Sequence, residues 1–374
     1  MRDVVVVGAG KIGATIADLL GGSGDYRVIV ADRSNLQLAT IRKSATVTTQ
    51  AIDITDATAL SSLLANRFAV LSAAPYNLTT RIAEAAAPLG VHYLDLTEDV
   101  ASTRRVRELA SGARAALIPQ CGLAPGFISI IAADLARGFD SLDSLKLRVG
   151  ALPQYPSNAL GYNLTWSTDG IINEYCEPCE AIVNGERVMV PALEERDEFS
   201  LDGVAYEAFN TSGGLGTLCE TFAGHIRTLN YRTIRYPGHA AIMKALLHDL
   251  RLADRRDVLK DIFENALPST LQDVVVVFVT VSGRKGGRLV QETYANKIYS
   301  GVVDGVKRSA IQITTAAGIC TVLDLLAHGV LPQSGFLRQE DIALDAFLAS
   351  RFGKVYARAQ DLGGAPVNEA NRAA

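Results

Sequence analysis

The most constraining feature of this sequence is the glycine pattern GAGKIG, which directly follows an apolar, β-branched run at residues 3–7. That run predicts a buried strand, and the apolar segment after the glycines predicts a helix to Leu20. Gly8 would allow a tight turn, Gly10 a close ligand approach, and Gly13 close packing of the helix on the strand. A strand, such a turn and a helix in this order favour binding of a dinucleotide at the helix N-terminus.

The sequence also has a carboxylate at the position where a dinucleotide site binds the ribose. Asp32 ends the second predicted strand, about 20 residues after the glycines. It is expected to accept the ribose hydroxyls and to repel a 2′-phosphate, so NAD is the expected cofactor. Arg33 beside it would tolerate that phosphate, so NADP stays possible. Lys11 and Ile12, in the first helical turn, are expected to face the phosphates with their N–H groups.

Strand and helix patterns alternate over residues 1–124, which predicts a doubly wound parallel sheet of the Rossmann type. Ligands bind at the carboxyl ends of such strands. Asp53, after the third strand, is expected either to contact the adenine or to cap the following turn. After the fourth strand, the small residues Ala73, Ala74 and Pro75 are expected to leave room for the second phosphate and the nicotinamide ribose.

The chain then changes to short strands joined by turns, and Asn184-Gly185 marks a hairpin. Residues 125–330 are expected to form an α+β domain with a mixed or antiparallel sheet. The tail after Asp361 is expected to fray. Helices are expected from His239 to about Leu252, from Ala310 to Leu326 and from Gln339 to Phe352.

Composition excludes several classes of protein. An apolar fraction of 48% with 20% charged residues is typical of a globular chain and not of a disordered one. A net charge of −4 argues against a nucleic-acid or anionic-membrane binder. We expect neither a signal peptide nor a membrane span. Five cysteines, few and odd in number, favour the cytoplasm, and the CEPC sequence lacks the further ligands that zinc needs, so no metal site is expected.

Six segments resemble the saccharopine dehydrogenase-like family of NAD(P)-dependent oxidoreductases. They are GAGKIG, LDLTED, CGLAPGF, GALPQYPSNALGYNLTWS, TSGGLGTL and RTIRYPGH. The glycine motif is common to many families, whereas the LPxxPxNxLGYxxxWS pattern and the RYPGH run are much more specific. The TSGG and RYPGH runs together are most similar to the lysine 6-dehydrogenase branch of that family.

The resemblance implies hydride transfer between a nicotinamide and an amine-bearing carbon of an amino acid. For the lysine branch, it implies NAD-dependent oxidation at the ε-carbon of L-lysine, followed by hydrolysis to 2-aminoadipate 6-semialdehyde and ammonia. It also implies that residues 331–374 return to the nucleotide domain and that the middle domain builds a homodimer. Two alternatives stay open: a saccharopine- or carboxy(nor)spermidine-type reductive coupling dehydrogenase, and a non-catalytic nucleotide-binding protein.

Amine oxidation needs a general base. Asp95, at the end of the fifth predicted strand, is expected to be that base or to pair with the substrate amine, the alternative being a helix cap. Tyr76 is expected to relay a proton or to stack on the cofactor. His239 is expected to bind substrate or water, or else to be a satisfied buried histidine. No paired catalytic carboxylates are apparent in the sequence.

The substrate carboxylate needs a cationic partner. Arg235 is the expected partner, the alternative being a structural ion pair with a carboxylate such as Glu174. The resemblance implies that Trp166 walls off the substrate pocket, the alternative being a place in the core. Three polar residues on the matched motifs are expected to orient the amino acid: Asn163, Thr211 and Ser212.

Overall fold

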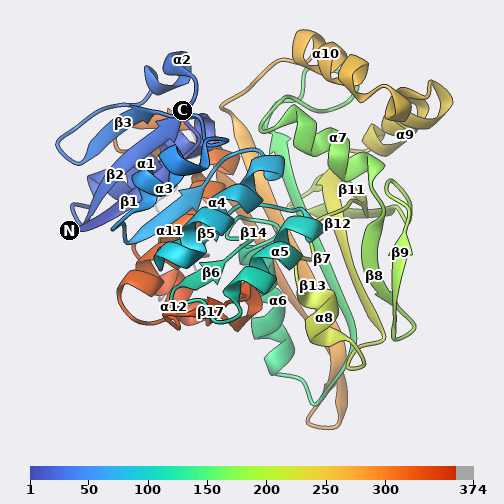
Figure 1. The fold of residues 1–374 in the computed structure, drawn as a ribbon. Coiled ribbons are helices and arrows are strands. Elements are labelled where there is room, and N and C mark those ends of the chain that lie inside the picture. The colour runs from blue at the N-terminus through green and yellow to red at the C-terminus, as the bar shows by residue number, and fades with distance from the viewer. Residues whose placement is uncertain (359–374) are drawn as a thin grey trace.

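The computed structural model describes residues 1–358, so the tail after Asp361 lies outside the described residues. Its first half is a parallel sheet of seven strands in the order β17-β6-β5-β4-β1-β2-β3 (Figure 1). The order reverses between β1 and β4, which makes the switch point where ligands bind in such sheets. The strands are β1 (Arg2–Val7), β2 (Tyr26–Asp32), β3 (Val47–Ala51), β4 (Ala69–Ser72), β5 (His92–Asp95), β6 (Ala116–Ile118) and β17 (Gly335–Phe336).

Helices cover both faces of this sheet. Val4 and Val6 of β1 pack into one hydrophobic cluster, and Val5 and Val7 pack into another. Because side chains alternate along a strand, a continuous valine run suits a strand that is buried on both sides. The helices that follow these strands are α1 (Lys11–Gly22), α2 (Asn35–Leu38), α3 (Ala57–Leu64), α4 (Tyr76–Leu89), α5 (Val100–Ala110) and α6 (Phe127–Arg137).

The second half is a mixed sheet of eight strands, which confirms the predicted fold class. β12 and β7 run parallel, and the other neighbours are antiparallel. Asn184 and Gly185 join β8 to β9 with φ of 52° and 88°, as a type I′ turn requires. The strands are β7 (Ser141–Pro153), β8 (Cys179–Val183), β9 (Glu186–Val190), β10 (Asp197–Leu201), β11 (Val204–Asn210), β12 (Thr228–Arg235), β13 (Asp273–Lys285) and β14 (Arg288–Tyr299).

Two helices differ from the expected ones. The segment from His239 is α-helical only to Lys244, and it continues as one π-helical turn. The expected helix from Gln339 is split into short turns, because the buried side chains of Gln339 and Glu340 bond to distant segments. The elements are α7 (Thr168–Cys176), α8 (Leu218–Phe222), α9 (His239–Lys244), η1 (Ala245–Asp249), η2 (Leu252–Asp254), α10 (Arg256–Ala266), η3 (Gln339–Asp341), α12 (Leu344–Ala349) and η4 (Gly353–Tyr356).

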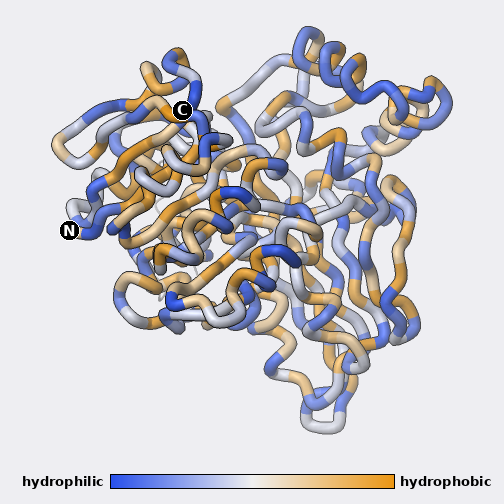
Figure 2. The backbone as a smooth tube through the Cα atoms, in the orientation of Figure 1, coloured by the Kyte–Doolittle hydropathy of each residue, from blue (hydrophilic) through white to orange (hydrophobic). Residues whose placement is uncertain are grey.

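Helix α10, which the sequence analysis does not assign, covers one end of the second sheet. Polar and apolar residues are interspersed along this helix (Figure 2), and its buried side chains are Leu259 and Phe263. These two side chains pack in a cluster with residues of α7 and α9, such as Ile171 and Met243. The three helices therefore form one layer over the sheet.

The chain returns to the first sheet through α11 (Ala310–Ala327), which packs against α1, and through β17, which pairs with β6. By length and composition α11 would suit a membrane, but 89% of it is buried within the fold, so it serves as a core helix. The predicted domain boundaries after residues 124 and 330 stay predictions.

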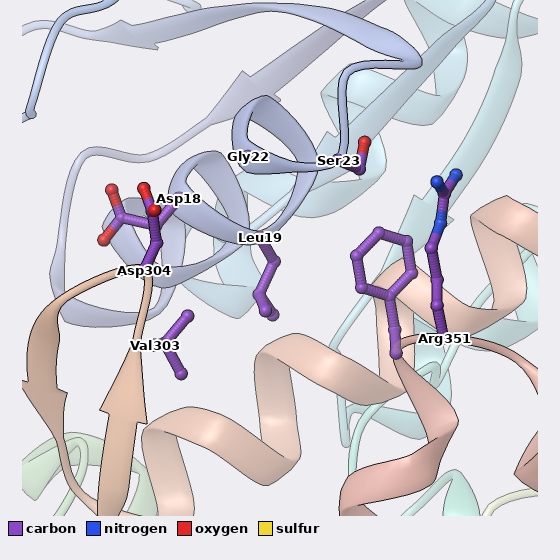
Figure 3. A pocket seen from close by; sticks show the side chains of 8 residues that line it. Asp18, Leu19, Gly22, Ser23, Val303, Asp304 and Arg351 are labelled. Atoms are coloured by element: carbon purple, nitrogen blue, oxygen red, sulfur yellow. The ribbon is translucent and has the colours of Figure 1, made fainter.

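A cavity of about 260 Å³ lies at the last turn of α1, beside the hairpin of β15 (Gly301–Val303) and β16 (Val306–Arg308) (Figure 3). Asp18 and Asp304 line it, and they pair with Arg308 and Arg42 respectively. A helix of 12 residues separates this cavity from the glycine turn at the other end of α1. The cavity is therefore distinct from the nucleotide-binding edge.

Candidate functional site

Of the three motif glycines, Gly8, Gly10 and Gly13, only Gly10 leaves open space for a ligand. A Cβ on Gly8 would lie 2.6 Å from the carbonyl oxygen of Ala73, and one on Gly13 would lie 1.9 Å from that of Gly8. These two glycines are therefore required by the packing of the chain itself. A Cβ on Gly10 would meet nothing within 4 Å, although Gly10 caps α1 without a side-chain hydrogen bond. The open space at this helix N-terminus fits a pyrophosphate.

Asp32 is held where it would meet a ribose. Its Oδ2 accepts a hydrogen bond from the Ala9 N–H at 2.8 Å, and its Oδ1 accepts one from the Ser34 N–H at 2.8 Å. Each carboxylate oxygen has a further lone pair for a ribose hydroxyl. Arg33 and Asp53 are exposed at the same edge. Asp53 accepts hydrogen bonds from the N–H and the hydroxyl of Thr55, so it closes a turn there.

Replacing Asp32 by Ala is expected to weaken NAD binding by about tenfold or more, which corresponds to the loss of one or two hydrogen bonds to a charged group. NADP should lose less, because the carboxylate also repels its 2′-phosphate. Fluorescence titration of both dinucleotides checks this, with the exposed Asp53→Ala as the matched control. Equal losses for the two dinucleotides would remove Asp32 from the ribose site.

The other predicted cofactor residues surround the glycine turn. Lys11 and Ile12 form the first turn of α1, and Pro75 is the N-cap of α4. Ala73 and Ala74, which link β4 to Pro75, are partly buried. Tyr76, the first residue of α4, is 51% exposed, so it stands at the rim of this edge instead of inside a buried proton relay.

Asp95 is fully buried, and the fold itself uses its carboxylate. Oδ1 accepts hydrogen bonds from the Thr97 N–H at 2.9 Å and the Gln120 N–H at 2.8 Å, and Oδ2 accepts one from the Tyr93 hydroxyl at 2.7 Å. Burial raises the pKa of Asp95 to about 6. This placement does not support Asp95 as the general base. Its contacts fix the loop that carries Glu98 instead.

A carboxyl pair lies where the two halves of the molecule meet. Glu98 follows β5 in the first half and is partly exposed, whereas Glu174 is buried on α7 of the second half. The two carboxyls lie close enough for each to shift the pKa of the other. Burial raises the pKa of Glu174 to about 7, although Arg235 and Glu98 oppose that shift. Burial and the Glu174 charge raise the pKa of Glu98 well above its ordinary value, so Glu98 holds a proton more strongly than a free glutamate does.

The TSGG loop after β11 packs against both members of this pair. The Ser212 N–H donates a hydrogen bond to the Glu174 carbonyl at 3.1 Å. A Cβ on Gly213 would lie 2.9 Å from the Cβ of Glu98, so a glycine is needed there. Thr211 is 2% exposed, and its Oγ1 is buried without a hydrogen-bond partner among the described residues. The loop thus places small and hydroxyl side chains beside the carboxyls.

Arg235 lies buried beside the pair, with an exposed fraction of 2%. Its Nε donates to the Tyr175 hydroxyl at 2.8 Å, and its Nη1 donates to the Ile234 carbonyl at 2.8 Å. Within residues 1–358, no carboxylate makes direct ion-pair contact with it, Glu174 included. The guanidinium therefore keeps donors for a ligand carboxylate.

His239 helps to position Arg235 through Tyr175. Its Nδ1 donates to the Leu160 carbonyl at 2.9 Å, so its Nε2 accepts from the Tyr175 hydroxyl at 3.0 Å. Burial, reinforced by the charge of Arg235, lowers the pKa of His239 to about 3, so the ring is neutral. The expected catalytic role is not supported, because the Leu160 carbonyl occupies one ring nitrogen and the other nitrogen orients Tyr175, which in turn orients Arg235.

Asn163 and Trp166 lie in the segment that leads into α7. Asn163 is 6% exposed, and its Oδ1 accepts from the Asn158 amide at 3.3 Å. The ring of Trp166 covers Gly170 of α7, where a Cβ would lie 2.4 Å from it. Trp166 therefore supports the helix that carries Glu174, whereas Asn163 holds the segment before it.

Glu98 and Glu174 were not identified as a pair from the sequence, because the two acids come from segments that meet only in the folded chain. Glu98 stands in the LDLTED motif directly after a predicted strand, and that position was the available signal. Glu207 was also missed. It is fully buried, and it caps α9 by accepting from the N–H groups of Gly238 at 3.1 Å and Ala240 at 2.7 Å.

Two family models together match nearly the whole described chain. Residues 4–118 match the saccharopine dehydrogenase NADP binding domain, and residues 122–354 match the saccharopine dehydrogenase C-terminal domain. The chain is 24% identical over 177 residues to the NADP- and L-glutamate-forming saccharopine dehydrogenase of Saccharomyces cerevisiae, which covers 46% of this chain and 40% of that enzyme. It is 22% identical over 314 residues to the mitochondrial alpha-aminoadipic semialdehyde synthase of Bos taurus, covering 79% and 33%. The chain thus spans less than half the length of these curated relatives.

Solved structures show the same fold. The apo L-Glu-forming saccharopine dehydrogenase of S. cerevisiae has a TM-score of 0.77 at 17% identity, covering 97% of this chain and 98% of that one. A homospermidine synthase of Legionella pneumophila in complex with NAD has a TM-score of 0.65 at 14% identity, covering 95% and 89%. These likenesses extend over both halves of the molecule.

Proposed function

This chain belongs to the saccharopine dehydrogenase family, and we propose that it oxidises the ε-amine of L-lysine with NAD, giving 2-aminoadipate 6-semialdehyde and ammonia. The observation that carries the proposal is the Glu98–Glu174 pair beside Arg235, at the edge where the first half binds its nicotinamide dinucleotide. Glu98 lies in the loop directly after β5, on the carboxyl edge of the sheet. Substrate and cofactor would therefore meet at one place.

The charges of this cluster complement those of lysine. L-Lysine carries one carboxylate and two ammonium groups, and the cluster offers one buried guanidinium and two carboxyls. Saccharopine carries three carboxylates, and no second buried cation accompanies Arg235 beside the pair in the described part of the chain. This difference favours oxidation of lysine over reductive coupling of the saccharopine type.

In the proposed reaction, Arg235 binds the α-carboxylate, and the Tyr175–His239 contacts hold the guanidinium in position. Ionised Glu174 accepts a proton from the ε-ammonium, which leaves a neutral amine whose carbon can release a hydride. Bound NAD supplies the hydride acceptor. Water then adds to the iminium carbon and loses one proton to solvent, while the carboxyl pair returns the first proton to the nitrogen. The hydroxyl proton leaves to solvent as the C–N bond breaks, which gives the aldehyde and ammonia.

Asp32 supports NAD as the preferred dinucleotide, although the family model is named for NADP. The exposed Arg33 beside Asp32 leaves a partner for a 2′-phosphate, so NADP should be accepted more weakly. A homodimer and a cytoplasmic location also stay proposals, which rest on the family resemblance and on the cysteine content.

The proposal is tested by measuring the formation of reduced nicotinamide at alkaline pH with NAD and L-lysine, L-ornithine, saccharopine or no amine. Turnover with lysine, with one ammonia released per reduced nicotinamide, is the expected result. Turnover only with saccharopine, or only when a carbonyl and an amine are coupled reductively, would contradict it. Binding of NAD without any turnover would favour a non-catalytic protein.

A further inference from the structure

Tyr231 on β12 presents a hydroxyl that the protein does not use. The residue is 7% exposed, and no hydrogen bond to its hydroxyl is made by any residue in 1–358. Its oxygen is not among the fully buried atoms without a partner in the described chain, so a ligand can reach it. The hydroxyls of the neighbouring tyrosines are already used, since Tyr175 bonds to Arg235 and His239, and Tyr162 contacts Thr165.

The position of this hydroxyl is fixed by its ring. A Cβ on Gly214 would lie 2.3–2.4 Å from the ring atoms of Tyr231, so the TSGG loop rests directly on the ring. Tyr231 and Arg235 are four residues apart on one strand, and they therefore project from the same face. The phenol interacts electrostatically with Glu98, Glu174 and Arg235. Burial raises the pKa of Tyr231 well above its ordinary value, so the group stays protonated and able to donate.

A second unused hydroxyl lies close by. The β11–β12 pairing ends with Asn210 opposite Arg232, so Thr211 and Tyr231 are the residues directly beyond the last pair. The Thr211 Oγ1 is buried and also lacks a partner in the described structure. The buried Thr211 hydroxyl and the accessible Tyr231 hydroxyl together indicate a place where the free protein leaves hydrogen bonds for a ligand to complete.

We propose that the Tyr231 hydroxyl, alongside Arg235, donates a hydrogen bond to the α-carboxylate of the amino-acid substrate. Tyr231 thereby selects substrates that carry a carboxylate. This inference rests on the proposed function, because it assigns one end of the same substrate. The guanidinium supplies the charge, and the hydroxyl supplies a second donor that fixes the orientation of the carboxylate.

The test is Tyr231→Phe, which removes the hydroxyl and keeps the ring on Gly214. For L-lysine, kcat/KM should fall about 10- to 100-fold, the range for one hydrogen bond to a charged group. 1,5-Diaminopentane has both amines but no carboxylate. Its inhibition constant, measured with lysine as the substrate, should differ by less than about twofold between the variant and the wild type. Equal losses for lysine and the diamine, or no loss for either, would overturn the assignment.

A stability measurement separates this role from a structural one. Because the hydroxyl has no protein partner, Tyr231→Phe should leave Tm unchanged or raise it. Tyr356→Phe is the matched control, because that buried hydroxyl donates to a protein group, the Thr314 carbonyl of α11. It should lower Tm and leave the lysine kinetics unchanged. A fall in Tm for Tyr231→Phe as large as the control's would overturn the assignment.

The two proposals fail in different ways. If the wild-type protein does not oxidise lysine, the proposed function fails, and the carboxylate assignment fails with it. If the wild type oxidises lysine and Tyr231→Phe does so equally well, only the Tyr231 assignment fails.

Discussion

Glu174→Gln is expected to lower kcat/KM for L-lysine by about 10²- to 10⁴-fold, the range for loss of a general base. Gln keeps the size and hydrogen-bonding capacity of the side chain but cannot take the proton from the ε-ammonium. The affinity for NAD should be unchanged, because Glu174 lies on α7 of the second half, outside the nucleotide-binding sheet. Initial rates of nicotinamide reduction at alkaline pH, together with an NAD titration, measure both quantities.

The pH dependence of kcat/KM tests independently whether Glu174 is the base. Burial raises the pKa of Glu174 to about 7, so the ionised base is lost as the pH falls through that value. For the wild type, kcat/KM should therefore rise with pH through about 7 and then level off.

Glu98→Gln is the matched control, because its amide can still donate to Glu174. Its activity should stay within about tenfold of the wild type. Equal loss in both glutamine variants, or a profile flat across neutral pH, would contradict the assignment of Glu174 as the base.

Gly10→Ala is expected to weaken NAD binding on the order of 100-fold, which is about 2.7 kcal/mol. The new Cβ would occupy the open space where the pyrophosphate is expected, and it would meet no protein atom within 4 Å. The backbone at Gly10 has φ −72° and ψ −173°, which alanine adopts freely. The free energy of unfolding should fall by at most about 1 kcal/mol, the cost of a poorer N-cap. Calorimetric titration and chemical denaturation measure the two effects.

Gly13→Ala is the matched comparison within the same motif. Its Cβ would lie 1.9 Å from the Gly8 carbonyl oxygen, so the strand and helix must separate. The expected loss is in stability, about 1–3 kcal/mol or more, and NAD binding should fall as a consequence. A loss of stability in Gly10→Ala as large as that in Gly13→Ala, or normal NAD binding in Gly10→Ala, would contradict the placement of the pyrophosphate at Gly10.

The nucleotide half could be predicted because its constraints are local in the sequence. The valine run of β1, the glycines at fixed spacing and the carboxylate that ends β2 each act over a few residues. The hairpin at Asn184-Gly185 is equally local, since positive φ at two adjacent positions selects those residue types. The helix after His239 was overextended because periodicity does not show where an α-helix changes to a π-helical turn.

The substrate site could be predicted only in part, because tertiary contacts decide what each polar group does. Asp95 ends a strand at the ligand edge, as a base would, yet three internal hydrogen bonds occupy its carboxylate. His239 is neutral because it is buried, which the RYPGH motif does not reveal. The pairing of Glu98 with Glu174 depends on how two halves of the chain pack together. No spacing within the sequence encodes that contact.

The most direct test of the central claim follows the hydrogen that leaves the substrate. L-Lysine carrying deuterium at both positions of its ε-carbon is incubated with NAD and the protein, and the reduced nicotinamide is analysed by mass spectrometry. The proposed reaction predicts one deuterium at nicotinamide C4 and a slower turnover than with unlabelled lysine. Reduced nicotinamide without deuterium, or none formed at all, would contradict hydride transfer from the ε-carbon of lysine.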